Sequence, residues 1–142
     1  EDEPRREEKN LYRLDYETHG PIIGYFHFSG KMGTFMYMEA ETVVTAVISA
    51  PPDAAPEVAR ELIAQRAAAC VQIIPRIRSF YRWEGEVHDE EEALLLVKTV
   101  EKKIADIEDI LDRVHPYEVP ELLVFPASGG LAAYLRWVEE ET

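Results

Sequence analysis

The alternation of polar and apolar residues is clearest over residues 79–99, SFYRWEGEVHDEEEALLLVKT. Alternating side chains before Glu84-Gly85 predict a half-buried strand, and the Glu-Gly pair suits a tight turn between the two arms of a hairpin. On the outgoing arm, a period of two places four large residues on one predicted face: Ile73, Ile77, Tyr81 and Trp83. The opposite face is mainly arginine, so the arm is predicted to bury one side only.

The return arm has two different halves. Residues 88–92, HDEEE, are polar on both faces and are expected to lie in water. Residues 93–97, ALLLV, are apolar on both faces, which a strand tolerates only when each face is covered. The chain's own helices can cover one face, and the other needs a partner. The predicted interface residues are therefore Tyr81, Trp83 and whichever of Leu95 and Leu96 faces that partner.

The remaining elements follow from similar patterns. A strand over 42–50 is followed by a helix that Asp53 is expected to cap and that runs to about Cys70. Thr99 is expected to cap a second helix, which Pro116 ends. A short strand over 121–125 comes next, and the apolar stripe of a terminal helix is formed by Leu131, Tyr134, Leu135 and Val138.

The order β-α-β-β-α-β-α predicts an α+β fold, a ferredoxin-like βαββαβ antiparallel sheet with an extra C-terminal helix. In that topology the first and third strands are central, and these are the two strands that are apolar on both faces. Residues 1–41 differ from the rest, with a charged run over 1–10 and a segment over 22–38 that suits a small hairpin. We therefore divide the chain into an N-terminal extension or fused segment, 1–41, and a domain, 42–142.

Composition and charge narrow the function. With 46% hydrophobic residues in a chain of 142, one domain can bury a core, and no apolar run approaches the roughly 18 residues of a membrane span. A formal net charge of −13 argues against nucleic acid and anionic membranes as partners. One cysteine and an N-terminus without an apolar signal region predict a cytoplasmic protein.

Candidate chemistry centres on the stretch HPYEVPE, residues 115–121. Its two prolines hold an imidazole, a phenol and two carboxylates close together, which suits a ligand site; the alternative is a rigid connector with a capping His115. Cys70 is favoured as a packed core thiol over a ligand, and His88 beside the acidic residues 89–92 is a competing place for cations. No phosphate-binding glycine loop, Gly-x-Ser-x-Gly or HExxH motif is present, so the chain is not expected to be an enzyme.

Several longer motifs resemble the CutA proteins, which are named for divalent-cation tolerance. They are VISAPPD, RAAACVQIIP, SFYRWEGEV, LLLVKT, HPYEVPELLVFP and YLRWV, and the resemblance covers about residues 42–140. It implies a ferredoxin-like protomer in a tight homotrimer, with strands continuing between subunits. It also implies binding of copper or another divalent metal, tied to Cys and His residues.

The resemblance carries over to single positions only in part. Cys70 and His115 match its metal-associated residues, whereas Ser49 stands where some members have a cysteine. The favoured hypothesis is a divalent-metal site, copper first, at His115 with Glu118 and Glu121, completed by a neighbouring subunit. The rival is a signalling or interaction scaffold that binds a small molecule or protein, because the family architecture is similar to the PII proteins, although their nucleotide loop has no counterpart here.

Overall fold

The computed structural model describes residues 23–28, 31–36 and 41–142, and side chains from residue 41 onward. The chain divides into two compact units, Glu1–Glu41 and Thr42–Thr142. In the first unit, β1 (Ile23–Phe28) and β2 (Lys31–Met36) pair as antiparallel strands. The charged run over 1–10 lies outside the described residues.

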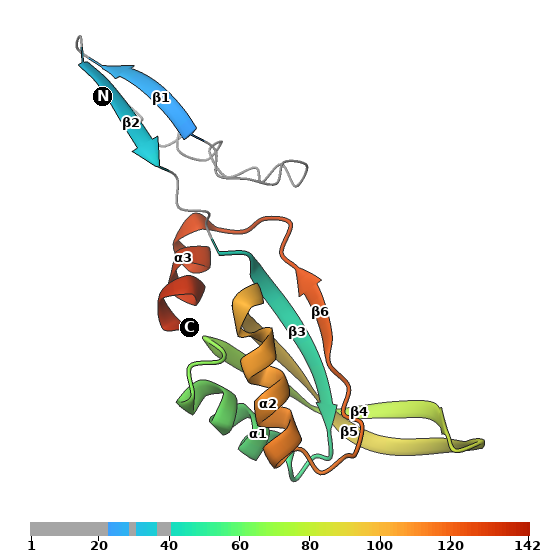
Figure 1. The fold of residues 1–142 in the computed structure, drawn as a ribbon. Coiled ribbons are helices and arrows are strands. Elements are labelled where there is room, and N and C mark those ends of the chain that lie inside the picture. The colour runs from blue at the N-terminus through green and yellow to red at the C-terminus, as the bar shows by residue number, and fades with distance from the viewer. Residues whose placement is uncertain (1–22, 29–30, 37–40) are drawn as a thin grey trace, which may run out of the picture. The chain divides into compact units, whose positions relative to one another are not determined.

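The second unit contains a four-stranded antiparallel sheet and three helices (Figure 1). Its elements are β3 (Val43–Ala50), α1 (Ala55–Ala64), β4 (Cys70–Trp83), β5 (Glu86–Val100), a 3-10 turn (Glu101–Lys103), α2 (Ile104–Val114), β6 (Leu123–Pro126) and α3 (Ala132–Glu141). The strand order is β4-β5-β3-β6, so β3 and β5 are central, as predicted. The predicted ferredoxin-like fold with an extra C-terminal helix is confirmed. Within the described residues, no helix is long and apolar enough to cross a membrane.

The core lies between the sheet and the helices α1 and α2. Every second residue of the two central strands faces these helices and is buried: Val44, Ala46, Ile48 and Ala50 of β3, paired with Thr99, Val97, Leu95 and Ala93 of β5. Val58 and Leu62 of α1 and Ile107 of α2 meet them and are fully buried. The other side of the sheet, which we call the open face, carries half-buried apolar residues, among them Val47, Leu94 and Leu96.

The two predicted helix caps are wrong. The N-cap of α1 is Ala54, which makes no side-chain cap, and Asp53 lies in the preceding turn. Backbone hydrogen bonds take over the cap's role, since the N–H groups of Ala54 and Ala55 both donate to the carbonyl of Pro51. The helix also ends at Ala64 rather than near Cys70.

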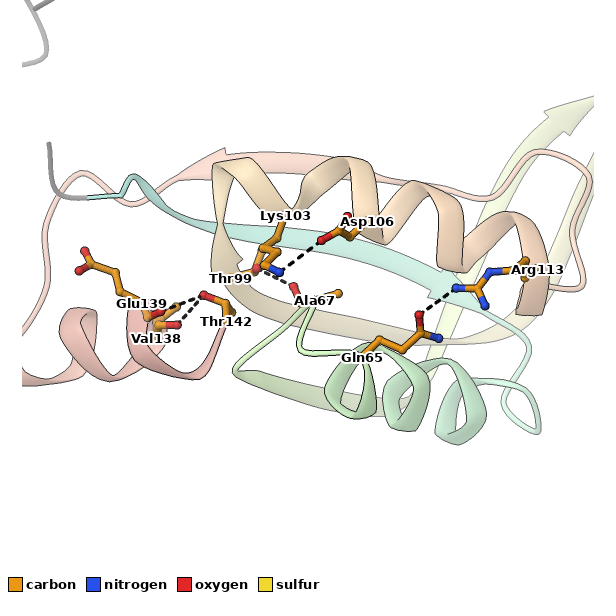
Figure 2. Close-up of polar contacts among 9 residues, drawn as sticks. All are labelled: Gln65, Ala67, Thr99, Lys103, Asp106, Arg113, Val138, Glu139 and Thr142. Atoms are coloured by element: carbon orange, nitrogen blue, oxygen red, sulfur yellow. Dashed lines mark hydrogen bonds and ion pairs between the residues drawn. The ribbon is translucent and has the colours of Figure 1, made fainter. Parts of the chain in front are cut away.

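Thr99 lies inside β5 instead of capping α2. Its Oγ1 donates a 2.6 Å hydrogen bond to the backbone carbonyl of Ala67, in the connection from α1 to β4 (Figure 2). Both residues are fully buried, so the hydroxyl satisfies a carbonyl that water does not reach. A second bond in Figure 2 joins the C-terminal ends of the two helices, from Arg113 Nη2 to Gln65 Oε1, at 3.0 Å.

Helix α3 packs against β3 and β5 through fewer residues than predicted. Val138 is its one buried residue, whereas Tyr134 is 43% exposed and Leu131, just before the helix, 75% exposed. Arg66, just past the end of α1, secures the helix from outside by donating to the carbonyl of Glu140 at 2.7 Å. Most of the predicted apolar stripe therefore remains on the surface of the single chain.

The hydrogen bond of Thr99 gives a stability prediction. Thr99→Val keeps the shape of the side chain but leaves the Ala67 carbonyl buried without its donor. We expect the free energy of unfolding to fall by about 1–3 kcal/mol, measured by denaturant unfolding at fixed protein concentration. Thr45→Val, a half-buried control on the open face of β3, should change it by less than about 1 kcal/mol. Equal losses in the two variants would contradict the assignment.

Candidate functional site

A β-bulge at Pro75 sets the geometry of the site. Residue pairing between β4 and β5 shifts by one between Ile74, opposite Leu94, and Ile77, opposite Glu92. Two residues of β4 therefore oppose one of β5, which is the usual form of a bulge, and proline is tolerated there because it has no N–H to donate. The shift moves every later odd-numbered residue of β4 to the other side of the sheet.

The predicted common face of the outgoing arm is accordingly wrong in one member. Ile73 pairs with Leu95 and packs on the helix side, whereas Ile77, Tyr81 and Trp83 lie on the open-face side. Pro75 was the signal for this switch, because a proline inside a strand marks a bulge or an edge. The bulge thus separates a core-packing half of β4 from a half that carries the aromatic residues.

Beyond the bulge, β4 and β5 continue as a two-stranded arm that extends past the rest of the sheet (Figure 1). The tip is a tight turn in which Glu84 has φ of 49° and Gly85 has φ of 85°, the two positive values that a type I′ turn requires. One face of the arm carries two arginine–carboxylate pairs, Arg76 with Glu91 at 2.8 Å and Arg78 with Asp89 at 2.5 Å. These pairs are exposed, so they contribute little stability.

The connector from α2 to β6 begins at His115, which is buried and extended, and Pro116 ends the helix as predicted. The backbone N–H of Tyr117 donates to His115 Nδ1 at 3.1 Å, so this nitrogen carries no proton. Nε2 therefore carries the proton and donates to the carbonyl of Ser49 at 2.8 Å. Both ring nitrogens are engaged within the chain, and the imidazole attaches the connector to the end of β3.

Tyr117 attaches the same connector to the hairpin. Its hydroxyl donates to Glu92 Oε1 at 2.9 Å. Glu92 is only 5% exposed, so the expectation that the whole acidic run 88–92 lies in water is wrong at its last residue. Burial, followed by the hydrogen bond to Glu92, raises the pKa of Tyr117 well above its usual value of 10. The proton therefore stays on the phenol at neutral pH.

An open hollow of about 600 Å³ lies between the arm, the connector and the end of β3. The arm contributes Ser79, Tyr81, Trp83 and Glu92, and β3 contributes Ser49. The connector contributes residues 116–121. We call this space the hairpin hollow. Its volume is in the range of small-molecule sites.

The residues predicted to bind metal do not come together in one chain. Glu118 and Glu121 line the hairpin hollow, whereas His115 is not among the residues that line it and both of its ring nitrogens are already bonded. Among the described residues, no group of three His, Cys, Asp or Glu is placed to hold a metal ion. The predicted site at His115, Glu118 and Glu121 therefore does not fit a metal within a single chain.

Two other candidates lie elsewhere. Cys70 is the first residue of β4 and is half-buried rather than fully buried in the core. His88 lies on β5, where its ring stacks on Tyr81 with 5.0 Å between ring centroids. Its Nδ1 is 3.9 Å from a carboxylate oxygen of Glu90, which also accepts the Tyr81 hydroxyl at 3.0 Å through its other oxygen.

The four predicted interface residues divide between the two faces of the sheet. Leu95 is fully buried against α1 and α2, so it belongs to the core of the chain itself. Leu96 is half-buried on the open face, which makes it the member of the pair that can meet a partner. Tyr81 and Trp83 are 37% and 44% exposed, on the same side of the sheet as Leu96.

Comparison with known proteins places this fold in a family. The family model described as CutA1 divalent ion tolerance protein matches residues 43–141. The chain belongs to the CutA1 family. The human Protein CutA is 37% identical over 102 residues, which are 71% of this chain and 57% of that protein. The chain thus spans little more than half of that relative's length.

Solved structures agree with this assignment. The divalent cation tolerance protein from Thermus thermophilus is 39% identical, with a TM-score of 0.69 over 70% of this chain and 98% of that one. A protein from Nostoc sp. PCC 7120, described as a PII-like protein CutA, is 32% identical, with a TM-score of 0.65 over 70% of this chain and 96% of that one. The predicted membership of the CutA family is confirmed, for the ferredoxin-like unit alone.

The contact between Tyr117 and Glu92 predicts a pH dependence of stability. The pKa of Tyr117 is higher in the folded chain than in the unfolded chain, so its contribution is complete below about pH 10 and is lost as the pH rises further. Wild type should lose unfolding free energy more steeply above pH 10 than Tyr117→Phe. Alkaline denaturant unfolding measures this, and tyrosinate absorbance should show one late-titrating group that the variant lacks. Equal slopes would mean that Tyr117 titrates normally.

Proposed function

We propose that this CutA1-family chain works as a homotrimer that binds its ligands without catalysis, in the cell's tolerance of divalent cations and in the cytoplasm. The observation that supports assembly is the apolar open face, where Leu94, Leu96 and Val47 of the two central strands remain half-buried. Central strands seldom leave such residues uncovered, because apolar area removed from water stabilises by roughly 25 cal/mol per Å². A second copy of the chain would cover them.

The edges of the sheet support the same proposal. Strand β6 is an outer strand, and its Leu123 and Phe125 are 54% and 53% exposed. In the arm, residues 86–92 of β5 pair only with β4 among the described residues, so their other side is a second free edge. Exposed strand edges are templates for pairing with another chain. When the arm of each chain meets β6 of the next, the contact is head-to-tail, and such contacts form a closed ring when the rotation between neighbours is one third of a turn.

A pair of leucine substitutions tests the assembly. Leu96→Glu places a charge on the open face, and we expect folded monomers where wild type has three times the chain mass by light scattering at micromolar concentration. Leu95→Glu should instead prevent folding, because Leu95 is in the core. Ala105→Glu on the exposed side of α2 adds the same charge and should leave the trimer intact. A wild-type monomer would overturn the proposal.

Copper is the proposed divalent ion, at positions to which more than one chain contributes. The family model and the Thermus thermophilus protein are described by divalent ion or cation tolerance, and one chain alone does not bring three ligands together among its described residues. Both nitrogens of His115 are bonded within the chain, so the proposed imidazole donor is His88, which lies beside Glu90 on the arm. Imidazole and carboxylate are suitable donors for copper.

Copper titration at physiological ionic strength tests this assignment, since diffuse attraction to the acidic surface is screened there. We expect wild type to bind with a defined stoichiometry. The monomeric Leu96→Glu and the variant His88→Ala should each bind at least tenfold more weakly, about 1.4 kcal/mol. His115→Ala should keep its affinity but lose stability. Unchanged affinity in His88→Ala, or binding in wild type that fades with added salt, would contradict the site.

A second candidate function is a PII-like scaffold that binds a small molecule. The observation that favours it is the hairpin hollow, which is about 600 Å³ and lined by aromatic and polar side chains within one chain. A ligand there would touch both the arm and the connector. Its binding could therefore alter the surface where we propose that chains meet.

A further inference from the structure

We propose that the hairpin hollow binds a small organic cation, a protonated amine on an apolar body, with the carboxylate of Glu92 as its counter-ion. This inference names the ligand class of the second candidate function and rests on it. It is independent of the copper proposal. Three features of the hollow support it: its negative charge, the low exposure of Glu92 without a cationic partner, and its aromatic walls.

The charge of the hollow favours a cation. Three of its lining residues are glutamates, Glu92, Glu118 and Glu121, and no lysine or arginine lines it among the described residues. The arginines of the arm lie on its other face, where Arg76 and Arg78 pair with Glu91 and Asp89. A phosphate or carboxylate ligand would meet negative charge without compensation, so nucleotides and other anions are disfavoured.

Glu92 supplies the specific contact. It is only 5% exposed, and its Oε1 accepts from Tyr117. Its Oε2 accepts no hydrogen bond from the described residues, where no buried side-chain oxygen lacks a partner, so Oε2 is the oxygen that solvent reaches, and no cationic side chain pairs with it there. A carboxylate with little solvent contact and no cationic partner favours a positive charge beside it, and an ammonium group in the hollow would supply both that charge and a hydrogen bond to Oε2.

The walls suit the apolar part of such a ligand. Tyr81 and Trp83 line the hollow from the arm, and aromatic faces attract cations within about 6 Å of the ring centre. Tyr81 is held in place by its hydrogen bond to Glu90 and by the stacked ring of His88. Pro116 and Pro120 stiffen the opposite wall.

The size of the hollow favours an organic cation over a bare metal ion. A metal ion needs several donors that converge on one point, and the described residues offer no such group of three. A space of about 600 Å³ instead suits a molecule that places one charged end near Glu92 and leaves its body against Trp83. The ligand is therefore expected to be recognised by charge at one end and by aromatic contact along its length.

Three probes of one shape test the charge requirement. Benzylamine is cationic at neutral pH, benzyl alcohol is neutral and benzoate is anionic. Each is titrated into the full chain carrying Trp137→Phe, so that Trp83 is the one tryptophan and its fluorescence reports the hollow. We expect benzylamine to bind at least tenfold more tightly than benzyl alcohol and benzoate not to bind.

Matched variants locate the counter-ion. In Glu92→Gln, which keeps an oxygen for Tyr117 but removes the charge, benzylamine should bind at least tenfold more weakly. Glu108→Gln, on the exposed side of α2, changes the net charge equally and should bind as wild type does. Equal weakening in both variants, or none in Glu92→Gln, would overturn the assignment to Glu92.

The outcomes separate this inference from the function on which it rests. Benzoate or benzyl alcohol binding as tightly as benzylamine would keep a small-molecule site and overturn its cation preference. No binding of any probe at millimolar concentration would overturn both. The comparison of the three probes needs no substitution in the hollow. It therefore tests the preference for a cation even where Glu92→Gln does not fold.

Discussion

The bulge at Pro75 decides which residues of β4 face the helices and which face the hairpin hollow. Without it, β4 would present Ile77, Tyr81 and Trp83 to the same side as Ile73, where α1 and α2 pack. With the bulge, the first half of β4 packs against the core, and its second half forms one wall of the hairpin hollow. A bulge at a residue that has no N–H to donate thus reverses the sides to which the later side chains of β4 point.

The connector after α2 matters because it fixes that arm to the sheet. An isolated two-stranded hairpin is marginal in water, so the arm needs contacts outside itself. His115 holds the connector to the carbonyl of Ser49, and Tyr117 holds it to Glu92. These two residues bridge β3 and β5 from one short segment that Pro116 and Pro120 restrict. The stretch is therefore a rigid connector, and residues 116–121 of it also line the hairpin hollow.

The fold was predictable because the runs that are apolar on both faces mark the central strands β3 and β5, and a period of three to four residues marks the buried side of α2. The site was predictable only in its connector. Its place in a run of carboxylates predicts that Glu92 lies in water, but the residue is buried and accepts a hydrogen bond from Tyr117, which is 25 residues away in sequence. Its residue type predicts that His115 binds metal, but its two nitrogens are engaged by the backbone groups of Tyr117 and of Ser49, which is 66 residues away in sequence.

The hairpin hollow and the proposed interface share one surface, and this links ligand binding to assembly. Glu92, Leu94 and Leu96 alternate along the same face of β5, so the carboxylate in the hollow and the leucine proposed to meet a partner belong to one strand. A ligand that binds the assembled form more tightly than the separate chain must, by the same factor, favour assembly. The buried charge of Glu92 gives this coupling a physical origin, because a partner that narrows the hollow lowers the local dielectric and strengthens the attraction between the carboxylate and a cation. The two proposals, a cation in the hollow and a partner chain on the open face, therefore predict a single coupled equilibrium.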